Sequence, residues 1–135
     1  MPADVAHDAR ASYQLTATDW ALRVGVALVF GVFALEKLAG TSWVAIFDAI
    51  GLGQGFRYVT GIVQLAGGAL LLVPRTARLG GALIASTMLG AIVIHLAVLD
   101  TGLAGAAVPA ALLPLVIGAA WNGRGQLPER GLSLR

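Results

Sequence analysis

The sequence contains no cysteine. Disulfide frameworks, thiolate metal sites and dithiol redox chemistry are therefore excluded for this chain. Charge is also scarce, because only 12% of the 135 residues are Asp, Glu, Lys or Arg, against about 25% in a typical soluble domain. The net charge of +2 is small and scattered, so no nucleic-acid partner is predicted. No phosphate loop, dinucleotide fingerprint or Ser/His/Asp nucleophile set is present.

Apolar residues take the place of the missing charge. They make up 58% of the chain, and 18 glycines are interleaved with Leu, Val and Ile. So little charge cannot cover a soluble sphere of this size, and small residues let helices pack closely in lipid. The composition predicts an all-α integral membrane protein with one domain.

Four segments are long and apolar enough to span a bilayer, which takes about 20 residues in a helix. Asp19 is a candidate N-cap for the first segment, and Pro109 and Pro114 predict a kink in the fourth. Short connections favour an antiparallel four-helix bundle over residues 19–121, with tails at 1–18 and 122–135. The predicted spans are about residues 20–40, 56–73, 77–99 and 102–121.

The distribution of basic residues predicts the orientation of the bundle. Only Lys37 and Arg57 fall on the side opposite the N-terminus. Both termini are therefore expected in the cytoplasm. The basic residues on the N-terminal side are Arg10, Arg23, Arg75, Arg78, Arg124, Arg130 and Arg135.

The first outer loop, TSWVAIFDAIGLGQGF, is half apolar. Trp43, Ile46, Phe47 and Ile50 recur at helical spacing, with Asp48 off that stripe. The pattern predicts a short helix lying in the membrane interface, followed by a flexible GLGQG segment.

Glu36, Gln64 and His95 each lie on a different span, where such groups usually face the bundle interior. At a rise of 1.5 Å per residue, Glu36 lies roughly 25 Å along the first span and His95 about 26 Å along the third. Gln64 lies roughly 12 Å down the second. All three belong to the outer half of the membrane, and Glu36 shares a stripe with Gly25 and Val29. They predict one polar pocket, with Glu36 and His95 as candidate catalytic residues and Gln64 as a ligand-binding residue.

Further polar residues border the predicted pocket. Thr60 shares the face of Gln64, and Lys37 is expected to reach the headgroups at the rim because its stem can stay in lipid. Haem or metal ligation by His95 is not expected, since the other histidine, His7, lies on the opposite side. The remaining candidates for the pocket are Lys37, Trp43, Asp48, Arg57 and Asp100.

The segment GVALVFGVFALEKLAG and four spans resemble the DoxX and DoxX-like family of small bacterial membrane proteins. Lys37 and Leu38 match the family's first helix, and GIVQLAGGALLL matches its second, except that Gln64 stands where the family often has glutamate. The third helix, LGGALIASTMLGAIVIHL, also fits. The resemblance implies a location in the bacterial inner membrane and a link to quinone-coupled oxidation and membrane oxidoreductase complexes.

Several functions remain open at this stage. The first is an accessory or quinone-binding subunit of a membrane redox system, with a quinone among Glu36, Gln64 and His95. The second is a membrane isomerase or cyclase in which Glu36 acts as acid and His95 as base. The third is a structural subunit of a larger membrane complex. A transporter or pore, which would need a homo-oligomer, ranks last. Lipids and a lipophilic small molecule are the expected partners.

Overall fold

The computed structural model describes residues 15–122 as helices joined by short turns, without a strand in that range. The predicted tails at 1–18 and 122–135 lie almost entirely outside the described residues. The helices are α2 (Ala17–Ala39), α3 (Val44–Ile50), α4 (Gly53–Leu72), α5 (Ala77–Ala97) and α6 (Gly102–Trp121). The all-helical prediction is thus confirmed, and α6 continues through Pro109 and Pro114.

The start of α2 differs from the prediction that Asp19 is its N-cap. Thr16 is the N-cap, and Asp19 occupies the third helical position. The Asp19 N–H donates to Thr16 Oγ1 at 3.2 Å, and the Thr16 N–H donates to Asp19 Oδ2 at 3.0 Å. This reciprocal capping box satisfies two backbone donors that a helix N-terminus otherwise leaves free.

A short helix, α3, forms in the loop after α2, but the GLGQG segment after it is not one flexible loop. Gly51 and Gly53 adopt positive φ angles of 79° and 76°, a conformation that glycine reaches without steric cost. The chain therefore turns sharply and α4 begins at Gly53, earlier than the predicted residue 56. The location of α3 in a membrane interface stays a prediction.

Three helices, α4, α5 and α6, are long and apolar enough to cross a membrane. Large apolar side chains also face outward, such as Leu103 with 82% of its surface exposed and Leu28 with 65%. These are the features of a membrane protein. The first predicted span, α2, is not among the three and carries four ionisable residues, Asp19, Arg23, Glu36 and Lys37. A fourth span and the inward position of the termini stay predictions.

Sequential helices pack against one another: α2 on α4, α4 on α5 and α5 on α6. A Cβ atom added at Gly80 would lie 2.5 Å from the Gly67 carbonyl oxygen and 2.6 Å from the Leu71 nitrogen. Since these are backbone atoms, α4 and α5 can approach this closely only with glycine at Gly80. The core beside this crossing contains Phe30, Leu71, Ile84 and Val116, each with 0% exposure.

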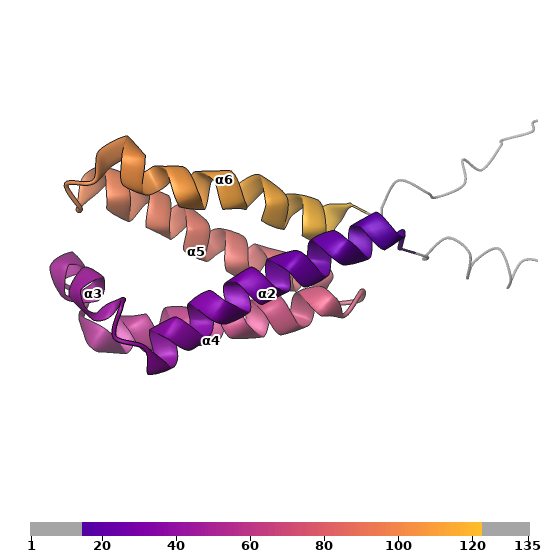
Figure 1. Ribbon diagram of the computed structural model, residues 1–135, viewed down its shortest axis with the longest axis horizontal. Helices are drawn as coiled ribbons and strands as arrows, with labels where there is room; N and C mark the ends of the chain where they lie inside the picture. The colour runs from indigo at the N-terminus through magenta and orange to yellow at the C-terminus, as the bar shows by residue number, and fades with distance from the viewer. Residues whose placement is uncertain (1–14, 123–135) are drawn as a thin grey trace, which may run out of the picture.

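The bundle is closed at one end and open at the other. In Figure 1 the α2–α4 pair and the α5–α6 pair lie close together near the start of α2 and the end of α6 and diverge toward the end that holds α3. The contact between α2 and α6 is correspondingly limited. This divergence creates the space for the cavity described next.

Candidate functional site

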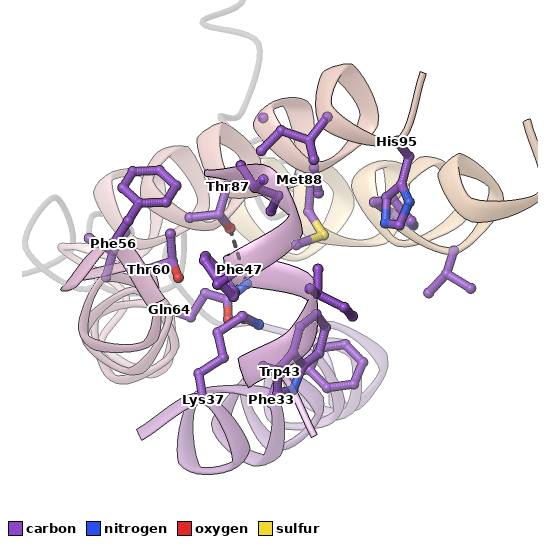
Figure 2. A pocket seen from close by; sticks show the side chains of 18 of the residues that line it. Phe33, Lys37, Trp43, Phe47, Phe56, Thr60, Gln64, Thr87, Met88 and His95 are labelled. Atoms are coloured by element: carbon purple, nitrogen blue, oxygen red, sulfur yellow. Dashed lines mark hydrogen bonds between the residues drawn. The ribbon is translucent and has the colours of Figure 1, made fainter. Parts of the chain in front are cut away.

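A cavity of about 550 Å³ lies at the open end, and α2 to α6 all contribute to its walls. Most of the lining is aliphatic or aromatic, and its aromatic side chains are Phe33, Trp43, Phe47 and Phe56. Figure 2 shows how these side chains and the polar ones gather around it. The polar lining residues are Lys37, Thr60, Gln64, Ser86, Thr87 and His95.

Lys37, the single lysine of the sequence, points into this cavity. Only 5% of its surface is exposed, and its Nζ donates to Gln64 Oε1 at 2.9 Å. The prediction that Lys37 reaches headgroups at the rim is therefore wrong. Within residues 15–122 no carboxylate pairs with the ammonium group.

Two aromatic rings lie beside the ammonium group. Lys37 Nζ lies 3.8 Å from the centre of the Trp43 ring and 5.6 Å from that of Phe33. The two rings meet edge to face at 6.2 Å between centroids. A cation over an aromatic face is stabilised by the ring quadrupole, by about 2 kcal/mol when both are desolvated. Trp43, at the N-cap of α3, thus helps to hold the charge inside.

Gln64 links Lys37 on α2 to Thr87 on α5. It is 2% exposed, and its Nε2 donates to Thr87 Oγ1 at 3.2 Å. The Thr87 hydroxyl donates in turn to the Ile84 carbonyl oxygen at 2.7 Å. Hydrogen bonds link Lys37 on α2, Gln64 on α4 and Thr87 on α5 into one continuous network, here called the polar chain. Figure 2 shows its members directed toward one another.

Glu36 lies on a different face of α2 from Lys37. It is exposed, accepts a hydrogen bond from Ser42 Oγ at 3.1 Å and does not line the cavity. The predicted orientation of Glu36 toward Gln64 and His95 is therefore wrong. The stripe that it shares with Gly25 and Val29 is an exposed face, and the buried stripe runs through Arg23, Val26, Phe30, Ala34 and Lys37.

Arg57 fastens α2 and α3 to α4 behind the cavity wall. Its Nη1 donates to the Lys37 carbonyl oxygen and, at 3.3 Å, to that of Gly40, so it satisfies the C-terminal end of α2. Its Nε donates to Gln54 Oε1 at 2.6 Å. Gln54 Nε2 donates to Asp48 Oδ1 at 2.6 Å. Arg57 and Asp48 thus hold the helices together and do not line the cavity.

His95 lines the cavity from α5, apart from the polar chain. Its Nδ1 lies 2.8 Å from Thr101 Oγ1, which leaves Nε2 without a hydrogen bond to any residue in the described range. A Cβ at Gly105 would collide with the ring at Nδ1, so glycine there makes room for the imidazole. Asp100, the other candidate nearby, is exposed and does not line the cavity.

Several residues that line the cavity were not predicted from the sequence. Thr87 was not predicted as part of the pocket, although a hydroxyl in an apolar span is itself a signal of a buried hydrogen bond. Phe33 and Met88 gave no signal, because aromatic and Met side chains are common on any face of a membrane helix. Within residues 15–122 no three His, Asp or Glu side chains gather in a way that could hold a metal ion.

Comparison with known proteins agrees with the family resemblance. The family model for the DoxX-like family matches residues 21–119. A curated relative from Bacillus subtilis (strain 168), named "Putative oxidoreductase CatD", is 36% identical over 73 residues. That match covers 53% of this chain and 54% of the relative, so this chain matches about half of the relative's length. No solved structure matches the chain. The family match extends over α4, α5, most of α2 and nearly all of α6, and the chain belongs to the DoxX-like family.

Proposed function

We propose that this DoxX-like protein binds a lipophilic ring compound of the quinone type in its cavity and serves a membrane oxidoreductase system. The observation that carries the proposal is the polar chain of Lys37, Gln64 and Thr87 inside an apolar, aromatic cavity. The name of the relative CatD supports the redox setting, although that name describes CatD alone.

The size and the walls of the cavity suit such a ligand. Its volume of about 550 Å³ falls within the range of about 300–1,000 Å³ that is common for small-molecule sites. Aromatic walls pack against a flat ring, and the aliphatic lining accepts a hydrocarbon tail. Quinone ring oxygens accept hydrogen bonds, and Lys37 carries N–H groups beyond the one that Gln64 accepts.

The lining residues also suit transfer of protons. A quinone, when bound, supplies two-electron chemistry that is coupled to proton uptake. Lys37 donates hydrogen bonds at one side of the cavity, and His95 presents Nε2 at another. Because an imidazole nitrogen can donate or accept a hydrogen bond, His95 Nε2 can exchange a proton with a ring oxygen.

The alternative of an acid–base isomerase or cyclase has no general acid at the cavity. That hypothesis needs Glu36 at the ligand, whereas Glu36 is exposed and hydrogen-bonded to Ser42.

The placement of the protein in the membrane is also part of the proposal. In it, α2 is a fourth span, both termini are in the cytoplasm of a bacterium, and the cavity lies in the outer half of its inner membrane. Partner subunits or further copies of the chain complete the redox system.

The test uses the protein in native-lipid nanodiscs. Solvent extraction and mass spectrometry are expected to find a quinone that co-purifies in stoichiometric amount. A protein with Trp20→Phe and Trp121→Phe keeps Trp43 as its single tryptophan. A short-chain ubiquinone analogue should then quench Trp43 fluorescence saturably.

Two variants provide the matched comparison. Lys37→Met should weaken quinone binding at least about tenfold, since it removes the donor at the ring oxygen. Arg78→Gln removes one positive charge from an exposed position outside the cavity and should leave binding unchanged. Absence of both a co-purifying quinone and saturable quenching would overturn the proposal.

A further inference from the structure

We infer that the cavity selects the anionic form of its ligand, an aromatic ring with an ionised, phenolate-type oxygen that pairs with Lys37. This inference rests on the proposed function, because it names the chemical class of the compound that occupies the same cavity. It goes further by assigning the ligand a charge, which quinone binding alone does not require.

The first argument is the charge of Lys37 and its surroundings. The Lys37 residue is only 5% exposed, and its ammonium group is hydrogen-bonded to one neutral acceptor, the Gln64 amide oxygen. Burying an ion without an opposite charge is costly, and an ion of opposite sign offsets that cost when it is hydrogen-bonded to the first. The lining contains one other titratable group, His95, and no carboxylate. The cavity therefore offers a positive group without a negative one.

The second argument is that nearby negative groups are already engaged elsewhere. The C-terminal carbonyls of α2 would normally stabilise a cation in the last helical turn. Here Arg57 Nη1 takes the carbonyl oxygens of Lys37 and Gly40. The Glu36 carboxylate bonds to Ser42 on the exposed side of α2, and the Asp48 carboxylate bonds to Gln54. Of these four charged side chains, only Lys37 lines the cavity.

The third argument concerns the shape of the anion. Phe33 and Trp43 stand around the ammonium group, and Phe47 and Phe56 pack with 6.1 Å between ring centroids farther along the wall. Flat rings pack well against aromatic walls in offset or edge-to-face geometry. An aromatic ring with an ionised oxygen provides both the negative charge and the flat shape, whereas an alkyl carboxylate would provide only the charge.

The experiment uses a 2-alkyl-4-nitrophenol and its methyl ether in nanodiscs of zwitterionic phosphatidylcholine. The visible absorbance band of the phenolate reports ionisation at a pH where little of the free probe is ionised. The protein is expected to raise the ratio of ionised to neutral probe about tenfold or more. The phenol should also bind about tenfold more tightly than the methyl ether.

Variants at position 37 separate charge from folding. Lys37→Met should abolish both differences while the methyl ether still binds, and Lys37→Arg should keep them. Because the sequence has a single lysine, ¹³Cε-lysine labelling gives one lysine resonance in the NMR spectrum. The chemical shift of this resonance should be that of an ammonium group and should move when the phenol is added. The control substitution Arg78→Gln by itself should not move it.

Each other outcome has a definite meaning. If the ether and the phenol bind equally, or the NMR shift is that of a neutral amine, charge selection is wrong while the cavity still binds rings. If dodecanoate displaces the phenol with equal affinity, selection of an aromatic anion is wrong. If neither probe binds and no quinone co-purifies, the proposed function itself fails together with this inference.

Discussion

The hydrogen bond between Lys37 Nζ and Gln64 Oε1, 2.9 Å long, predicts an energetic coupling that a double-mutant cycle can measure. The variants are Lys37→Met, Gln64→Leu and the two combined. Each replacement introduces an apolar side chain similar in size to the native one. The cycle therefore removes the polar interaction with little change in volume.

The magnitude follows from what each variant leaves behind. Gln64→Leu removes the single acceptor of a buried ammonium group and the donor to Thr87, and a hydrogen bond to a charged group is worth about 1.5–3 kcal/mol. Its cost should be about 3 kcal/mol. Once Lys37 is Met, Gln64→Leu loses only the neutral bond to Thr87, at about 1 kcal/mol. The coupling is therefore about 2 kcal/mol, with the double variant more stable than the sum of the single effects predicts.

The assay is reversible unfolding in mixed detergent micelles, followed by circular dichroism, with the free energy of unfolding compared for all four proteins. Ser86→Ala provides the control cycle with Lys37→Met. Ser86 lines the cavity, but its hydroxyl donates to the Leu83 carbonyl oxygen, so these effects should add. A Lys37–Gln64 coupling below about 0.5 kcal/mol would show that the ammonium group reaches water or headgroups instead, and would refute the polar chain.

Three further predictions concern the crossing, the rim and the helix junction. Gly80→Ala should cost about 1–3 kcal/mol of unfolding free energy, because its Cβ meets backbone atoms. Gly90→Ala on the same helix, with nothing within 4 Å of its Cβ, should be neutral or stabilising; equal effects would contradict the close crossing. Glu36→Gln should change stability by less than about 0.5 kcal/mol and leave quinone affinity unaltered. A loss of binding would show that Glu36 is part of the binding site. Arg57→Met should destabilise by about 2–3 kcal/mol and accelerate amide exchange across α3, whereas unchanged exchange would show that α3 is held by other contacts.

Much of the fold could be predicted because its signals are local. Runs of apolar residues of bilayer length predict the long helices within a few residues, and the boundaries of α6 were predicted as they are observed. The early start of α4 was missed, because Gly51 and Gly53 shape a tight turn that sequence alone does not distinguish from a flexible loop. The capping box at Thr16 was overlooked because Asp19 also fits the N-cap preference.

The candidate site was predicted only in part. Gln64 was expected to face the bundle interior, and it is buried together with Gly61, Gly67 and Gly68, small residues that let another helix approach. The same reasoning failed for α2, where Gly25 has no atom within 4 Å of an added Cβ. A glycine in a membrane helix marks a close contact only when another helix lies against that face.

The sequence by itself determined the class of this protein and its supply of polar groups. Its scarcity of charge and its apolar runs require helices in lipid, and it offers few polar side chains from which a site could form. The tertiary structure decided which of two adjacent residues enters the cavity. Glu36 and Lys37 lie roughly 100° apart around one helix, and apolar residues surround both. The difference comes from Gln64 and Thr87 on α4 and α5, since a buried ammonium group needs an acceptor that only packing can bring to it.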